Sequence, residues 1–141
     1  MYRPIETYRG VVYPWAIDHV GHMNVASYTA RFDEATWHFL GALGLTPSYL
    51  KQNERSAVAA EQRTQYKREV VSGCLLHVTT ELRELGRKSI RFGHTMFDSE
   101  NGEVVATTEL VGVYFDIVRR VSVDIPELVR EAAKKLERQE L

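Results

Sequence analysis

Residues 24–43 carry the clearest hydrophobic pattern of the chain. Apolar side chains recur there every three or four residues, which is the spacing of one helical face. They are Val25, Tyr28, Phe32, Ala35, Phe39 and Leu43, widened by Ala26, Trp37, Leu40 and Ala42. Asn24 is a favoured N-cap residue, and Gly44 suits a left-handed C-terminal cap. We therefore predict a long helix that is apolar around so much of its surface that other structure must wrap it.

Alternating apolar and polar residues predict strands in most of the remaining chain. The expected strands cover residues 8–13, 57–67, 76–83, 90–96 and 104–116. Ser72-Gly73 and Gly86-Arg87 fit turns, and Asn101-Gly102 is a strong hairpin signal. Residues 111–115 are apolar on both faces, so we expect the last strand in the centre of its sheet.

The end of the chain predicts a second helix. Asp124 and Glu127 resemble a capping box, and the apolar residues that follow the cap are Ile125, Leu128, Ala132 and Leu136. The element order is then strand, long helix, four meandering antiparallel strands and terminal helix. No repeat or linker interrupts it, which predicts one α+β domain over residues 1–141, with an antiparallel sheet curled around the long helix. Because the sheet edges stay open, we expect a homodimer joined through them, or a homotetramer.

Composition narrows the class of function. The chain has 141 residues, 44% of them apolar and 26% charged, with a net charge of -1, so we expect no nucleic-acid partner. Cys74 is the single cysteine, which excludes an intrachain disulfide and a multi-cysteine zinc site; we expect no metal and read Cys74 as a small core residue. No secretory signal or apolar run of membrane-spanning length is visible. We therefore expect a cytoplasmic protein without a membrane partner.

The segment before the long helix carries a motif. Residues 17–24 read Ile-Asp-His-Val-Gly-His-Met-Asn, and Tyr28 follows on the predicted helix. This resembles the signature of 4-hydroxybenzoyl-CoA thioesterase-like hotdog proteins, in which Asp, two residues and Gly-His-hydrophobic-Asn precede a helical tyrosine. The resemblance continues through residues 85–89, 102–106 and 111–116 and covers nearly the whole chain. Ala16 departs from it, where many relatives carry an acidic residue, as does Val25, where many have a second asparagine.

The resemblance implies the hotdog fold and hydrolysis of an acyl-CoA to free acid and coenzyme A, with Asp18 as general base or nucleophile. Coenzyme A is part of that substrate, so no separate cofactor is expected. The residues themselves suit the chemistry, because the first N–H groups of a helix lack intrahelical partners and can polarise a carbonyl. We predict five substrate-binding residues beside Asp18: Gly21, His22, Asn24, Tyr28 and Trp15.

Two other carboxylates are alternatives to Asp18 as the catalytic residue. Glu34 on the long helix is one, because a second branch of hotdog thioesterases uses a helical carboxylate, and Glu61 in a mild strand is the other. Two other functions are also alternatives. One is an acyl-CoA dehydratase or hydratase that uses His22 with a carboxylate, and the other is a non-catalytic acyl-CoA-binding module.

The sequence also offers alternatives for the residues that bind the phosphates of coenzyme A and for those that contact the acyl group. Arg87, Lys88 and Arg91 are our candidates for binding the coenzyme A phosphates, with Arg119-Arg120 as a second group. The aromatic residues Tyr13, Trp15 and Trp37 are first read as packing residues, with Trp37 in the helix core. Alternatively they shape an acyl pocket for an aromatic or quaternary-ammonium group.

Overall fold

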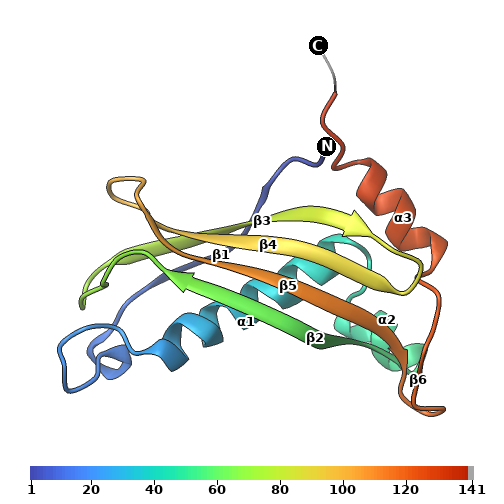
Figure 1. The fold of residues 1–141 in the computed structure, drawn as a ribbon, viewed down its shortest axis with the longest axis horizontal. Helices are drawn as coiled ribbons and strands as arrows, with labels where there is room; N and C mark the ends of the chain where they lie inside the picture. Colours follow the sequence, from blue (N-terminus) through green and yellow to red (C-terminus); the bar gives the residue numbers. More distant parts are fainter. Residues whose placement is uncertain (140–141) are drawn as a thin grey trace.

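A computed structural model describes residues 1–139 and shows one curled antiparallel sheet with α1 lying along it (Figure 1). The strands are β1 (Ile5–Val11), β2 (Arg55–Tyr66), β3 (Leu75–Leu85), β4 (Ser89–Asp98), β5 (Val104–Asp116) and β6 (Val121–Ser122). The helical elements are the 3-10 turn η1 (Pro14–Ala16), α1 (Val25–Ala42), α2 (Pro47–Gln52) and α3 (Glu127–Lys134). The predicted α+β hotdog fold is confirmed.

The strand order differs from the predicted meander. The sheet runs β1-β3-β4-β5-β2, with β6 paired to the end of β5. β3, β4 and β5 form the expected meander, but β2 pairs with β5 and not with β3. An alternating pattern indicates that a segment is a strand but does not indicate which strand pairs with it, and this explains why the position of β2 was predicted wrongly. β5 does lie inside the sheet, as its two apolar faces indicated, and β1 and β2 are the edges.

The predicted long helix is α1. Asn24 caps it, since its Oδ1 accepts a hydrogen bond from Ser27 N–H at 2.8 Å. Gly44 follows its end with φ +91°. The buried face consists of Tyr28, Phe32, Ala35, Phe39 and Leu40. Trp37 is 42% exposed, so its predicted place in the helix core is wrong.

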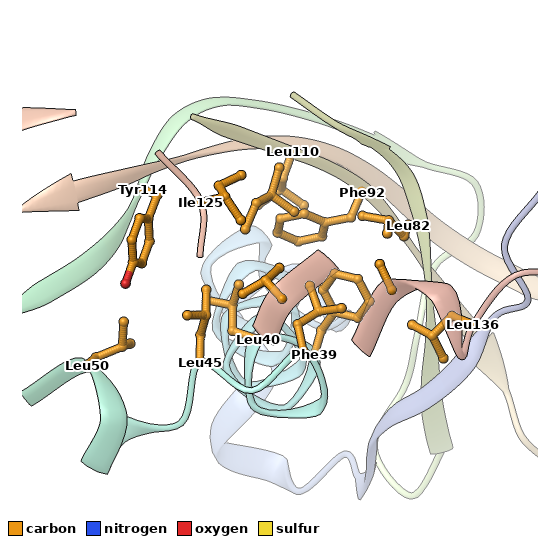
Figure 2. Packing of buried hydrophobic residues seen from close by; sticks show 14 residues of the cluster. Phe39, Leu40, Leu45, Leu50, Leu82, Phe92, Leu110, Tyr114, Ile125 and Leu136 are labelled. Atoms are coloured by element: carbon orange, nitrogen blue, oxygen red, sulfur yellow. The ribbon is translucent and has the colours of Figure 1, made fainter. Parts of the chain in front are cut away.

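The core has two parts along α1. Figure 2 shows the part around the C-terminal half of α1, where Phe39 and Leu40 pack under Phe92 and Leu110 of the sheet. Ring centroids of Phe39 and Phe92 lie 5.1 Å apart. The second part surrounds Phe32 in the N-terminal half. The sheet therefore fixes the whole length of α1, including its first turn.

Of the two short helices, only the terminal helix, α3, was predicted. α2 was missed; Thr46 caps it by accepting from Tyr49 N–H at 3.1 Å. α3 begins after Pro126 without a side-chain cap, so the capping box at Asp124 is wrong. Asp124 instead pairs with Arg87 at 3.3 Å. No helix within residues 1–139 combines the length and apolar character needed to cross a bilayer.

A buried polar chain crosses the centre of the sheet and reaches α1. His94 on β4 is buried; its Nε2 lies 2.8 Å from Thr36 Oγ1 on α1, and its Nδ1 lies 2.7 Å from Thr80 Oγ1 on β3. Thr80 in turn contacts Thr7 Oγ1 of β1 at 2.7 Å. Desolvation lowers the pKa of His94 to about 3, so the ring is neutral at physiological pH.

Candidate functional site

The loop that carries Asp18 is closed on itself. Ile17 and Met23 form an isolated β-bridge, and Asp18 N–H donates to the His22 carbonyl at 3.1 Å. Gly21 takes φ +96°, a conformation that other residues resist, and donates its N–H to the Asp18 carbonyl at 3.0 Å. Asp18 is half-buried, and its Oδ1 accepts from Val20 N–H at 2.9 Å. One carboxylate oxygen is thus held by the loop while the other remains available.

A second segment, residues 68–70 after β2, anchors this loop. Met23 N–H donates to the Val70 carbonyl at 2.7 Å, and His22 Nε2 lies 3.0 Å from Glu69 Oε2. Tyr28 Oη donates to the Arg68 carbonyl at 3.1 Å. Burial, and then the nearby Tyr66, raise the pKa of Tyr28, which keeps its phenol protonated as a donor. In the single chain, His22 and Tyr28 therefore hold the loop in place.

The first turn of α1 offers free hydrogen-bond donors. Asn24 Oδ1 occupies Ser27 N–H, whereas the N–H groups of Val25 and Ala26 have no acceptor within residues 1–139. Together with the helix dipole they provide a positive site immediately after the Asp18 loop. An oxygen that gains negative charge would be stabilised there.

A cavity of about 530 Å³ lies between α1 and strands β2, β4 and β5. Its walls are mostly apolar, and it extends along α1 from Ala26 to Leu40. None of Asp18 and the five predicted substrate-binding residues lines it. Trp15 is 81% exposed and stacks on Tyr13, with ring centroids 4.7 Å apart. The cavity therefore includes Ala26, one of the two residues with a free N–H group, but not Asp18 in this single chain.

Sequence reasoning missed the polar residues that line this cavity. They are Thr29, Asp33, Thr36 and Gln62; Trp37, which the sequence offered as an alternative acyl-pocket residue, also lines it. A signal was present, because Ala26, Ala30, Asp33 and Trp37 repeat at helical spacing as a second stripe beside the buried face. The long run of apolar residues on α1 hid this stripe.

The rival carboxylates lie outside the cavity. Glu34 is exposed on α1 and is not among the lining residues. The pairing of β2 with β5 shifts between Ala59 and Glu61, and Gln62 then lines the cavity. Because successive side chains of a strand point to opposite faces, Glu61 points to the outer face of the sheet.

The predicted phosphate-binding residues lie far from Asp18 in one chain. The Lys88 carbonyl accepts from Tyr114 N–H at 2.9 Å, and Tyr114 pairs with Ala57 near the start of β2. The Asp18 loop is attached just beyond the other end of β2, which has 12 residues, or roughly 40 Å at about 3.3 Å per residue. Arg87 and Lys88 thus belong to the opposite end of the molecule, in the turn between β3 and β4 (Figure 1).

The remaining basic residues are at or near the same end. Arg119 and Arg120 follow β5, whose last residue, Asp116, pairs with Arg55 at 3.1 Å. Arg91 is exposed on β4, opposite Val111 of β5. The two basic groups that the sequence left as alternatives therefore form one basic end. Within residues 1–139, no cluster of three His, Cys, Asp or Glu side chains is placed to hold a metal ion.

Comparisons with known proteins support one family. The chain is 29% identical over 137 residues to the L-carnitine dehydrogenase/betainyl-CoA thioesterase of Agrobacterium fabrum, covering 97% of this chain and 28% of that protein. It thus spans less than a third of that relative's length. It is 27% identical over 109 residues to the betainyl-CoA thioesterase of Pseudomonas aeruginosa, covering 77% of this chain and 69% of that protein.

Solved structures share the fold. A Staphylococcus aureus protein solved in complex with CoA superposes with a TM-score of 0.88 at 20% identity, covering 100% of this chain and 91% of that one. The gentisyl-coenzyme A thioesterase BH1999 gives a TM-score of 0.78 at 27% identity, covering 89% and 97%. The family model of the thioesterase-like superfamily matches residues 12–133. This chain therefore belongs to the thioesterase-like superfamily.

Proposed function

We propose that this protein is an acyl-CoA thioesterase that cleaves its substrate to a free acid and coenzyme A at the start of α1. One observation carries the proposal: the half-buried Asp18 precedes a helix start whose Val25 and Ala26 N–H groups are free, and an apolar cavity begins at Ala26. The thioesterase names of the relatives support the same reaction.

In the proposed reaction, the thioester oxygen accepts hydrogen bonds from the N–H groups of Val25 and Ala26. These donors stabilise the negative charge that develops when the carbonyl carbon is attacked. Asp18 acts by one of two routes. As general base it takes a proton from the attacking water; as nucleophile it forms a mixed anhydride that water then hydrolyses. In both routes the C–S bond breaks, the thiolate leaves with the electron pair, and water supplies the acid's new oxygen.

A second copy of the chain completes the proposed site. β2 is an edge strand, and its residues 57–60, between Arg55 and Glu61, are uncharged, with Val58 45% exposed. Pairing two β2 strands antiparallel about a two-fold axis would satisfy the open edge. The same operation brings the partner's basic end beside this chain's Asp18 loop, because the start of one β2 then lies against the end of the other.

The relatives and structural neighbours differ in the acyl group that their names give. Betainyl-CoA, named for two relatives, carries a short acyl group with a trimethylammonium cation. Gentisyl-CoA, named for a structural neighbour, carries a neutral aromatic acyl group. Both are small enough for the cavity beside α1.

Thiol release from a panel of acyl-CoA thioesters tests the reaction. The panel is run with the wild type, Asp18→Asn, and the two rival carboxylate variants Glu34→Gln and Glu61→Gln. We expect Asp18→Asn to lower kcat on the order of 10²- to 10⁴-fold while the two rivals retain wild-type rates. No thiol release from any thioester contradicts the proposed function; a loss confined to Glu34→Gln or Glu61→Gln contradicts the role of Asp18.

Mixing two inactive variants tests the role of the second copy. Asp18→Asn is unfolded and refolded together with an Arg87→Ala/Lys88→Ala double variant. A site built from two chains leaves one intact site in each mixed dimer, with Asp18 from one protomer and the basic residues from the other. Activity should therefore return on mixing. Dimers that form, as seen by light scattering, without recovery would show that each chain holds its own complete site.

A further inference from the structure

The acyl cavity contains a single ionisable side chain. Of the residues that line it, Asp33 alone carries a charge; the others are apolar residues, glycine, threonines, one glutamine and Trp37. No cation within residues 1–139 pairs with the Asp33 carboxylate, although other exposed carboxylates, such as Glu6 and Glu109, have arginine partners. Asp33 is an exposed residue of a mostly apolar cavity wall, and an unpaired carboxylate there attracts a positively charged ligand group.

The position of Asp33 fits a cation close to the thioester carbonyl. Asp33 is seven residues after Ala26, which corresponds to about 10 Å along the helix axis at about 1.5 Å per residue. Helical side chains lean toward the N-terminus, so the carboxylate lies over the preceding turn, near Thr29 and Ala30. A carbonyl oxygen held by the Ala26 N–H therefore leaves room for a few bonds before the acyl chain meets Asp33. The small side chains of Ala26 and Ala30 keep that space open.

Trp37 supplies a second element that favours a cation. It follows Asp33 by one helical turn, lines the same cavity and is 42% exposed. An indole ring attracts quaternary ammonium groups through its negative face, and the methyl groups of such a cation suit the apolar walls. A carboxylate and an indole one turn apart can contact one trimethylammonium group from two sides.

We infer that Asp33 and Trp37 determine acyl specificity by selecting CoA thioesters whose acyl group carries a quaternary ammonium ion a few bonds from the carbonyl. The inference rests on the proposed thioesterase function and assigns its substrate class. Asp33 is a specificity residue in this account, not the base, because the free N–H donors and Asp18 lie at the start of α1. A neutral acyl group of the same shape lacks the charge that Asp33 binds.

A pair of substrates of equal shape tests the inference. Betainyl-CoA and 3,3-dimethylbutanoyl-CoA differ by a nitrogen cation in place of a quaternary carbon. We expect the wild type to prefer betainyl-CoA in kcat/KM, and Asp33→Asn to lower that preference on the order of 10- to 100-fold. Glu34→Gln removes the neighbouring charge on α1 outside the cavity and should keep the wild-type preference. Trp37→Leu should lower the preference more than Trp37→Phe does.

The alternatives give different results. Equal losses on both substrates in Asp33→Asn would make Asp33 part of the chemistry and would overturn the inference. Equal wild-type rates, or hydrolysis of neutral thioesters alone, would also overturn it while leaving the thioesterase function standing. If no thioester is hydrolysed, calorimetric binding of the same two compounds to the wild type and Asp33→Asn still decides: tighter binding of betainyl-CoA that Asp33→Asn abolishes supports the inference, and equal binding refutes it.

Discussion

The buried His94 makes the stability of this protein depend on pH. Its ring nitrogens contact Thr36 and Thr80, and desolvation lowers its pKa to about 3, against an unfolded value of about 6.5. Between these two values the unfolded chain binds a proton that the folded chain does not. The free energy of unfolding therefore falls as pH falls from about 6.5 toward about 3.

The size of the effect follows from the two pKa values. One bound proton corresponds to about 1.4 kcal/mol per pH unit, so His94 contributes a loss of about 2 kcal/mol between pH 7 and pH 5 and about 5 kcal/mol in full. The lowered pKa of Asp116, caused first by the hydrogen bond from Arg119 N–H, acts only at more acidic pH. The window between pH 7 and pH 5 thus separates the effect of His94 from that of Asp116.

Urea unfolding of wild type and His94→Gln at pH 7 and pH 5 measures this contribution. Glutamine keeps an amide that can bond to threonine but does not titrate, so the variant should be less stable at pH 7 yet lose about 2 kcal/mol less than the wild type on acidification. His38→Gln, which changes an exposed histidine on α1, is the matched control and should behave as the wild type.

Two results would refute the reasoning about His94. One is an equal loss of stability in wild type and His94→Gln between pH 7 and pH 5. The other comes from the wild type alone and does not depend on the variant folding: NMR signals of the His94 ring that titrate with a midpoint near the ordinary value of about 6.5 would show that the folded ring accepts a proton.

Three further substitutions test how the site is held, each by urea unfolding. Asn24→Ala removes the cap of Ser27 N–H and should cost about 1 kcal/mol; an unchanged stability would contradict the cap. Phe32→Ala opens a cavity under the first half of α1 and should cost about 3–5 kcal/mol, and a smaller loss would mean that the core collapses around it. Gly21→Ala strains a residue at φ +96° and should cost about 1–2 kcal/mol; an intact loop without loss would refute the strain.

Local signals predicted the limits of the first helix well. Asn24 caps α1 and Gly44 follows its end, because each depends on residues close in sequence. Central placement of β5 also followed from its two apolar faces. Asp124 shows the limit of such signals. Glu127, three residues later, completes the sequence pattern of a capping box, but the helix begins only after Pro126. Asp124 pairs with Arg87 instead.

Features set by distant parts of the chain were not predictable in the same way. The pairing of β2 with β5 leaves β2 at an edge, and no alternating pattern contains that information. The cavity arises only when α1 lies under β2, β4 and β5, so the place of Asp33 in its wall appeared only in three dimensions, whereas Trp37 was already an alternative pocket residue from the sequence. The separation of Arg87 and Lys88 from Asp18 likewise depends on the length of β2.

The central claim is that the free N–H groups at the start of α1 polarise the thioester carbonyl. The kcat of the Val25→Pro variant tests this claim most directly. Proline at the first helical position removes one free N–H donor and is compatible with the helix, and Asn24 already has the extended ψ of 158° that a following proline requires. We predict that kcat for thiol release falls on the order of 10²- to 10³-fold while the thermal unfolding midpoint stays at its wild-type value. A folded Val25→Pro variant with wild-type kcat would contradict the account.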